Sequence, residues 1–250
     1  MNKGVFISMP SFQYGRTTID YAVEYKPEKQ DVTISVEWLE GVKVVAPEGI
    51  DPTLLDSILY KKAPWIIDKW QALNQISDPP APKEFVSGEK FAYLGRNYRL
   101  KVLKSEEVIK PIFLFKQSKF IATLPPHLTE EERIPYFQQA FKDWYIRYGE
   151  KKLQERLEVY HSKMGVIPTK IKLKEQKMRW GTCTNEGAIY LNWRIMMAPM
   201  PIIDYLLVHE LAHMKYPNHS DDFWHFVKSV ISDYEQRKEW LRINGPTLTL

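Results

Sequence analysis

Two histidines and a glutamate lie within one of the most apolar stretches of the chain, and no other feature restricts the fold as strongly. The segment reads HELAH from His209 to His213 and follows a largely aliphatic run that begins at Ile202. Side chains four residues apart share one face of a helix, so both imidazoles can bind one metal ion. Histidines in an apolar helix are costly unless they are hydrogen-bonded or bind a metal. The segment therefore predicts a buried helix that carries metal ligands, with hydrogen-bonded core histidines as the alternative.

Glu210 follows the first of these histidines directly, which places it roughly 100° around the helix from His209. It can therefore reach a metal-bound water without being a ligand, which is the position of a general base. A zinc ion lowers the pKa of such a water toward ~7 and polarises the carbonyl that is attacked. The pattern predicts hydrolysis of a peptide bond without a covalent intermediate, with Glu210 returning the proton to the leaving amine.

A zinc site of this kind needs a third protein ligand and one open position. His219 lies six residues after His213, and Pro217 ends the helix so that the chain can turn back toward the metal. We therefore expect Zn²⁺ to be held by His209, His213 and His219. Three other side chains are alternatives for the third ligand, namely Glu235, Glu239 and His225.

The remaining sequence predicts a mixed α+β fold in two parts. Residues 1–128 alternate between apolar and polar side chains over several segments, which predicts a β-rich portion with one or two helices at 52–75. In this portion we expect an antiparallel meander over 18–47 and two hairpins that turn at Arg96-Asn97 and Gln117-Ser118. The proline-rich segment at 77–82 predicts a boundary or an extended crossing. Residues 129–250 are expected to form the second part, which holds the metal ligands.

Composition limits the class and the compartment of the protein. Of its 250 residues 44% are hydrophobic, which suits a globular protein, and its net charge of +4 is too small to require a nucleic acid or membrane partner. The segment 195–208 is broken by prolines and is shorter than a bilayer span, so we expect no membrane association. Cys183 is the only cysteine, and the first twenty residues hold no signal-peptide core. These features favour a cytoplasmic protein.

Three blocks of the sequence together resemble one known family. They are RWGTC at Arg179–Cys183, LNWR at Leu191–Arg194, and VHELAHMKYPNHSDDFW from Val208 to Trp224. This order resembles the YgjP-like metallopeptidases, a group with the zincin fold that is related to the SprT-like proteases. The first block usually reads RWGSC, so Thr182 is a departure. The resemblance implies a zincin-like metallohydrolase core over 129–250, with His209, His213 and His219 as zinc ligands and Glu210 as the catalytic glutamate.

Six further residues in these blocks are candidates for binding the substrate or supporting the metal ligands. They are Arg179, Trp180, Cys183, Asn192, Arg194 and Trp224. For Arg179, Trp180 and Cys183 the alternative is a structural turn with a buried thiol. For Arg194 the alternative is an ion pair with a nearby carboxylate, which is the commoner fate of an arginine.

Three functions are compatible with the sequence. The first is a zinc metallopeptidase that acts on a peptide or protein. The second is a metal-dependent nucleoside triphosphate pyrophosphohydrolase of the UTP type, an activity also attributed within the family. It fits the basic residues between Lys170 and Arg179, although phosphates usually arrive with Mg²⁺ on carboxylates. The third is a DNA-associated protease like the SprT-like relatives. Its only support is the basic strand with Lys172 and Lys174, which could contact phosphates.

Overall fold

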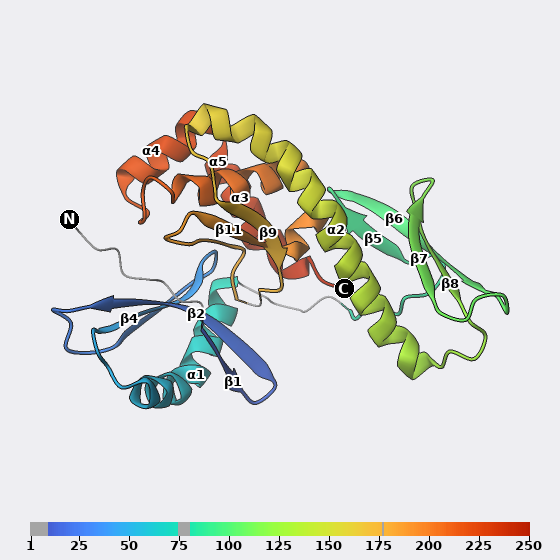
Figure 1. The fold of residues 1–250 in the computed structure, drawn as a ribbon, viewed down its shortest axis with the longest axis horizontal. Coiled ribbons are helices and arrows are strands. Elements are labelled where there is room, and N and C mark those ends of the chain that lie inside the picture. Colours follow the sequence, from blue (N-terminus) through green and yellow to red (C-terminus); the bar gives the residue numbers. More distant parts are fainter. Residues whose placement is uncertain (1–9, 75–80, 177) are drawn as a thin grey trace.

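The protein combines three β-sheets with five α-helices in a mixed α+β fold, described by a computed structural model over residues 10–74, 81–176 and 178–250 (Figure 1). The first four strands form what we call the N-terminal sheet, in the order β1-β2-β4-β3. Their bounds are β1 Ser11–Tyr14, β2 Thr17–Lys26, β3 Thr33–Glu37 and β4 Gly41–Pro47. Helix α1 (Pro52–Asn74) covers this sheet and buries its apolar face, so a single helix occupies the region expected to hold one or two.

The N-terminal sheet is not the antiparallel meander that the alternating pattern suggested. β2 pairs with β4 in parallel, while β1 and β3 are antiparallel partners at the two edges. Alternation fixes which side chains face the core, but it does not fix the order of the strands. β4 buries four of its seven residues and takes a central position, whereas β3 buries only Val36 and lies at an edge.

Four more strands form the hairpin sheet, in the order β5-β6-β8-β7. Their bounds are β5 Lys90–Tyr93, β6 Arg96–Lys104, β7 Ile112–Lys116 and β8 Lys119–Leu124. The two expected hairpins are present, and the second turns at Gln117-Ser118 as predicted. The first hairpin turns at Leu94-Gly95 and not at the predicted Arg96-Asn97. Leu94 and Gly95 both adopt the positive φ that a two-residue hairpin turn needs.

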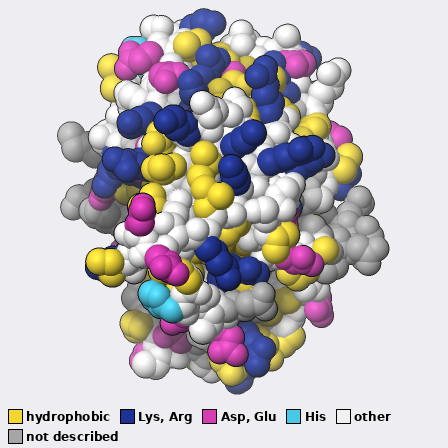
Figure 2. Space-filling model, turned by 90° about the vertical axis from the view of Figure 1, so that its right-hand side faces the viewer, with side chains coloured by type: hydrophobic (Ala, Val, Ile, Leu, Met, Phe, Trp, Pro, Cys, Tyr) yellow, Lys and Arg dark blue, Asp and Glu magenta, His cyan; other side chains and the backbone are white. Residues whose placement is uncertain are grey.

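The outer face of the hairpin sheet is cationic. Lys90, Arg99, Lys119 and Lys116 occupy directly paired positions on its four strands, so they form one row across the sheet. Exposed aliphatic side chains, including Leu114, lie in the neighbouring rows. Figure 2 shows this end of the molecule, with lysine and arginine side chains on either side of a hydrophobic strip.

The second part begins with the long helix α2 (Glu130–Met164), which starts at a capping box of Thr129 and Glu132 and ends at Gly165 in the left-handed conformation. The site sheet follows, in the order β10-β11-β9. The remaining elements are β9 Lys170–Lys174, β10 Gly181–Cys183, β11 Ala188–Asn192, a 3₁₀ helix at Trp193–Met197, α3 Met200–Ala212, α4 Asp221–Val230, α5 Tyr234–Asn244 and a 3₁₀ turn at Gly245–Thr247. Strand β10 and the first 3₁₀ helix were not expected from the sequence.

Two hydrophobic clusters form the interior. One joins the N-terminal sheet to α1, and the other joins the hairpin sheet, α2, the site sheet and α3–α5. Leu39 belongs to the second cluster although it lies in the turn between β3 and β4, and Met178 belongs to the first cluster although it precedes β10. The predicted division at residues 128 and 129 stays a prediction, and most of the proline-rich segment at 77–82 lies outside the described residues.

None of the helices in the described part of the chain is both long and apolar enough to cross a bilayer.

Candidate metal centre

Helix α3 and the turn after it bring three histidines together. His209 lies in the last turn of α3 and is fully buried, and His213 is the C-cap of that helix. The chain then turns, and His219 stands directly before Ser220, whose hydroxyl accepts a hydrogen bond from the backbone N–H of Phe223 and caps α4. His219 is therefore fixed by the start of the next helix, while His213 is oriented by a contact between its Nδ1 and the carbonyl oxygen of Tyr216 at 3.1 Å.

The three imidazoles face one another through Nε2. The Nε2 atom of His209 lies 3.2 Å from that of His213 and 3.1 Å from that of His219. Two other ring nitrogens thus approach the single Nε2 atom of His209, which carries at most one proton and can donate only one hydrogen bond. A tetrahedral zinc ion at 2.0–2.1 Å from each nitrogen would hold them about 3.3 Å apart. The donor set and its spacing therefore fit a zinc ion.

A fourth candidate ligand atom comes from the turn between two strands of the N-terminal sheet, which the sequence did not predict. Glu40 lies in the turn between β3 and β4, and its Oε1 is 2.6 Å from Nε2 of His219, 3.0 Å from that of His213 and 3.6 Å from that of His209. All four ligand atoms lie within 4.8 Å of one another. A single glutamate 169 positions before His209 carries no local signal, and Glu40-Gly41 was predictable only as a turn.

Burial sets the protonation of these ligands. It lowers the pKa of His209 to about 3, which leaves its imidazole neutral and able to bind a metal. Burial would by itself raise the pKa of Glu40, but hydrogen bonds with the three histidines hold that pKa far below its usual range. The site therefore presents a neutral imidazole at His209 and an ionised carboxylate at Glu40, whereas the hydrogen bond with Glu40 outweighs burial and raises the pKa of His213.

Glu210 is buried beside the three histidines, and its carboxylate packs against Gly181 of the RWGTC block. Burial raises the pKa of Glu210 to about 8, and its Oε1 has no hydrogen-bond partner among the described residues. A Cβ on Gly181 would lie only 2.6 Å from Cδ of Glu210. The φ of Gly181 is not in the left-handed region, so this position needs glycine for space and not for backbone conformation. The block thus makes room for the carboxylate.

The candidates Asn192 and Arg194 hold the framework of the site. Asn192 Nδ2 donates to the carbonyl oxygens of Gln176 at 2.6 Å and Arg179 at 3.2 Å, which fixes the segment before β10. Arg194 forms an ion pair with Glu175, which also accepts a hydrogen bond from the indole N–H of Trp193 at 3.0 Å. This is the ion pair that was the alternative for Arg194, and its part in binding a substrate stays a prediction.

The other four candidates have different surroundings. Trp224 stacks on His219, with ring centroids 5.3 Å apart and planes at 18°. Arg179 is buried, and its guanidinium donates to the hydroxyl of Thr182 at 3.4 Å. Burial raises the pKa of Cys183 to about 12, so it is a thiol and not a nucleophilic thiolate. Trp180 is buried in the second hydrophobic cluster, where a Cβ on Gly245 would lie 2.8 Å from its ring.

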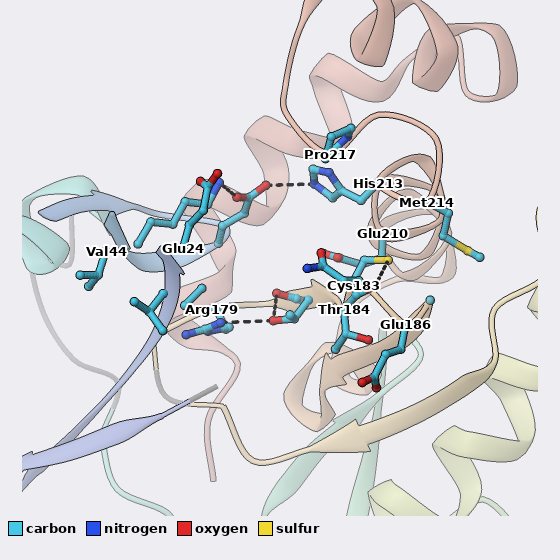
Figure 3. Close-up of a pocket in the computed structure, with 18 of the residues that line it drawn as sticks. Glu24, Val44, Arg179, Cys183, Thr184, Glu186, Glu210, His213, Met214 and Pro217 are labelled. Carbon is cyan, nitrogen blue, oxygen red and sulfur yellow. Dashed lines mark hydrogen bonds and ion pairs between the residues drawn. The ribbon is translucent and has the colours of Figure 1, made fainter. Parts of the chain in front are cut away.

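A cleft of about 680 Å³ opens beside the histidines, between the N-terminal sheet and the β10–β11 hairpin (Figure 3). Glu40, Glu210, His213 and Arg179 are among the residues that line it. In Figure 3, Cys183, Thr184 and Glu186 of the β10–β11 hairpin form one wall of the cleft, and Glu24 and Val44 of the N-terminal sheet lie opposite them. A volume of this size suits a peptide segment or a small molecule.

Residues expected as alternatives lie elsewhere. Among the described residues, the group of metal-ligand atoms includes none of Glu235, Glu239 and His225. Two lysines of the basic run are also engaged. Lys172 forms an ion pair with Glu150 at 2.7 Å, and Lys174 lies 3.6 Å above the ring of Tyr190. These cations do not converge on a phosphate site.

Comparison with known proteins identifies the family. No curated protein sequence matches this chain significantly. A solved structure that resembles part of it is the crystal structure of the metallopeptidase zymogen of Pyrococcus abyssi abylysin, with 24% identity, a TM-score of 0.33 and coverage of 34% of this chain and 88% of that one. The model of the YgjP-like family, described as a metallopeptidase domain, matches residues 30–244 and thus includes Glu40 as well as the three histidines. The chain therefore belongs to the YgjP-like family, and it is a metal-dependent peptidase.

Proposed function

We propose that this protein is a zinc metallopeptidase whose residues 129–250 form a zincin-like core, with His209, His213 and His219 as the zinc ligands. The observation that carries the proposal is the convergence of three Nε2 atoms, at 3.1 and 3.2 Å from His209 to the other two, beside a buried glutamate that lines a cleft. Zinc is favoured because imidazole nitrogen suits it and because the spacing matches a tetrahedral ion.

Glu210 is the proton carrier of the proposed reaction. A zinc ion held by these histidines would supply a Lewis acid and would lower the pKa of a bound water. Glu210 Oε1 is unengaged by the described residues, so the carboxylate in its ionised form can accept a proton from the attacking water. It then passes that proton to the nitrogen of the leaving amine. Gly181 keeps the carboxylate in place, and Asn192 holds the segment that leads into Gly181.

The cleft favours an extended peptide as the substrate. β10 is an edge strand of the site sheet, and its three residues line the cleft. An extended peptide can pair with such an edge through main-chain hydrogen bonds. The nucleotide alternative has less support, because Lys172 and Lys174 are engaged with other side chains.

The proposed role of Glu210 predicts that Glu210→Gln keeps the metal but lowers peptide hydrolysis by a factor on the order of 10³, because the base is lost while the ligands remain. Hydrolysis of casein and consumption of UTP would be measured together with the metal content. Glu186→Gln, which changes a carboxylate elsewhere in the cleft, is the matched control and should retain activity. Undiminished hydrolysis by Glu210→Gln, or consumption of UTP but not casein, would contradict the proposal.

A further inference from the structure

We propose that Glu40 is a fourth protein ligand of the metal, which closes the site in the resting enzyme and must be displaced before the substrate can react. This inference rests on the proposed zinc site and adds a means of control to it. The N-terminal sheet would then act as a built-in inhibitor of the metal centre that it covers.

The position of the carboxylate is that of a ligand. Oε1 of Glu40 is in contact with the Nε2 atoms of His213 and His219, at 3.0 and 2.6 Å, and lies 3.6 Å from that of His209. A tetrahedral ion bound by three imidazoles has one position left, on the side opposite the three nitrogen atoms. Oε1 lies against the open side of the histidine cluster and therefore fills the position that a reacting water needs.

The turn that carries Glu40 is fixed to the metal-binding part by its neighbours. The backbone N–H of Trp180 donates to the carbonyl oxygen of Leu39 at 2.8 Å, and the Leu39 side chain is buried in the second hydrophobic cluster. Gly41 has a φ of +77°, and a Cβ there would lie 2.5 Å from the carbonyl oxygen of Met178. The chain on both sides of Glu40 is thus seated against the segment that leads into β10, so its approach to the histidines is built into the fold.

The carboxylate has a second partner that can hold it when it leaves the metal. Lys43 on β4 forms an ion pair with the other oxygen, Oε2, and lies 3.9 Å from Glu37. A rotation of the Glu40 side chain can therefore free the fourth position while the carboxylate stays paired with Lys43. Glu40 also lines the cleft, so a peptide that binds there competes with it for the metal.

The test uses the full-length protein loaded with Co²⁺ and titrated with azide, a small anion that reports an open position through the visible absorption of cobalt. Wild type, Glu40→Ala and the control Glu37→Ala would be compared. Glu37 is the control because it is a carboxylate near the same lysine but outside the metal-ligand group. Glu40→Ala is expected to bind azide at least about tenfold more tightly than wild type and to hydrolyse peptide at least about tenfold faster, whereas Glu37→Ala should behave like wild type.

Equal azide binding by wild type and Glu40→Ala would overturn the inference, and so would complete loss of cobalt from Glu40→Ala in a folded protein. Glu40→Gln, which keeps the shape of the side chain, serves as the second variant if the alanine variant does not fold. His209→Ala separates the two proposals. If it binds cobalt as well as wild type does, the metal site itself is wrong. If it loses cobalt while Glu40→Ala leaves the azide titration unchanged, only the fourth ligand is wrong.

Discussion

Gly181 determines where the side chain of Glu210 can lie, although Gly181 has no side chain of its own. The carboxylate of Glu210 fills the space that a Cβ on Gly181 would need, and the two residues come from β10 and α3. The RWGTC block was predicted to support the site, but the candidates chosen from it were the side chains of Arg179, Trp180 and Cys183. The role of Gly181 cannot be predicted from the block, because steric exclusion by a distant residue leaves no pattern in the sequence.

Gly181→Ala is expected to lower peptide hydrolysis by about 10² or more, because the new methyl group displaces Glu210 from its position beside the ligands. Metal content and thermal unfolding would be measured alongside activity, and the metal content should match that of wild type. Full activity in Gly181→Ala would show that Glu210 does not act from the position seen here.

At the scale of elements, the site depends on how α3 ends. The helix stops at Ala212, the chain turns over Tyr216 and Pro217, and the cap of α4 holds His219 beside His209. The six-residue spacing and the proline were sufficient to predict this return of the chain. They could not predict β10, which is only three residues long, or the order of the N-terminal strands.

The α3–α4 turn predicts that His219→Ala lowers zinc affinity by about 10² or more, because one of three imidazole ligands is lost. Glu235→Ala should leave the affinity unchanged, since the Glu235 carboxylate accepts a hydrogen bond from Tyr234 and lies outside the ligand group. Competition with a chelator measures both affinities. The opposite pattern would move the third ligand to α5.

A second link between elements is the half-buried carboxylate of Glu175, which joins Lys142 of α2 to Arg194 of the 3₁₀ helix. Burial opposes its ionisation, but hydrogen bonds from Lys142, Arg194 and Trp193 lower the pKa of Glu175 to about 2. Since the folded pKa lies below the unfolded value, the stabilisation is complete above about pH 4.5 and is lost as the pH falls toward 2.

Glu175→Gln is therefore expected to lower the free energy of unfolding by about 1 kcal/mol at pH 7, a figure kept small because solvent screens this half-buried group. The difference from wild type should shrink as the pH falls below about 4. Urea unfolding at pH 7 and pH 3 measures it. A difference of equal size at both values would mean that the ionised carboxylate is not what stabilises the fold.

At the scale of the whole molecule, the candidate metal centre lies beside the place where the two hydrophobic clusters meet. Each cluster there contains one side chain from the other part of the chain. Leu39 enters the core of the metal-binding part, and Met178 enters the core of the N-terminal sheet. The sequence indicated a β-rich first part and a metal-binding second part. It did not indicate that the first part supplies Glu40, because contacts between residues so far apart depend on the packing of the two parts.

The arrangement of surface charge also could not be predicted from the sequence. The basic run at 170–179 stood out in the sequence, yet Lys172 forms an ion pair and Lys174 lies over an aromatic ring. The row of cations that the fold assembles lies instead on the hairpin sheet, from Lys90 across Arg99 to Lys116. Strand register brings these residues together, and register cannot be read from a charge count.

The most direct test of the central claim is the metal content of the purified protein, measured by native mass spectrometry for wild type and for His209→Ala. The account predicts about one zinc ion per wild-type chain and none in the variant, because His209 lies at the centre of the three converging imidazoles. Circular dichroism of both proteins would establish that the variant is folded. Wild type without zinc, or equal zinc in both proteins, would contradict the account and make these histidines part of a hydrogen-bonded core.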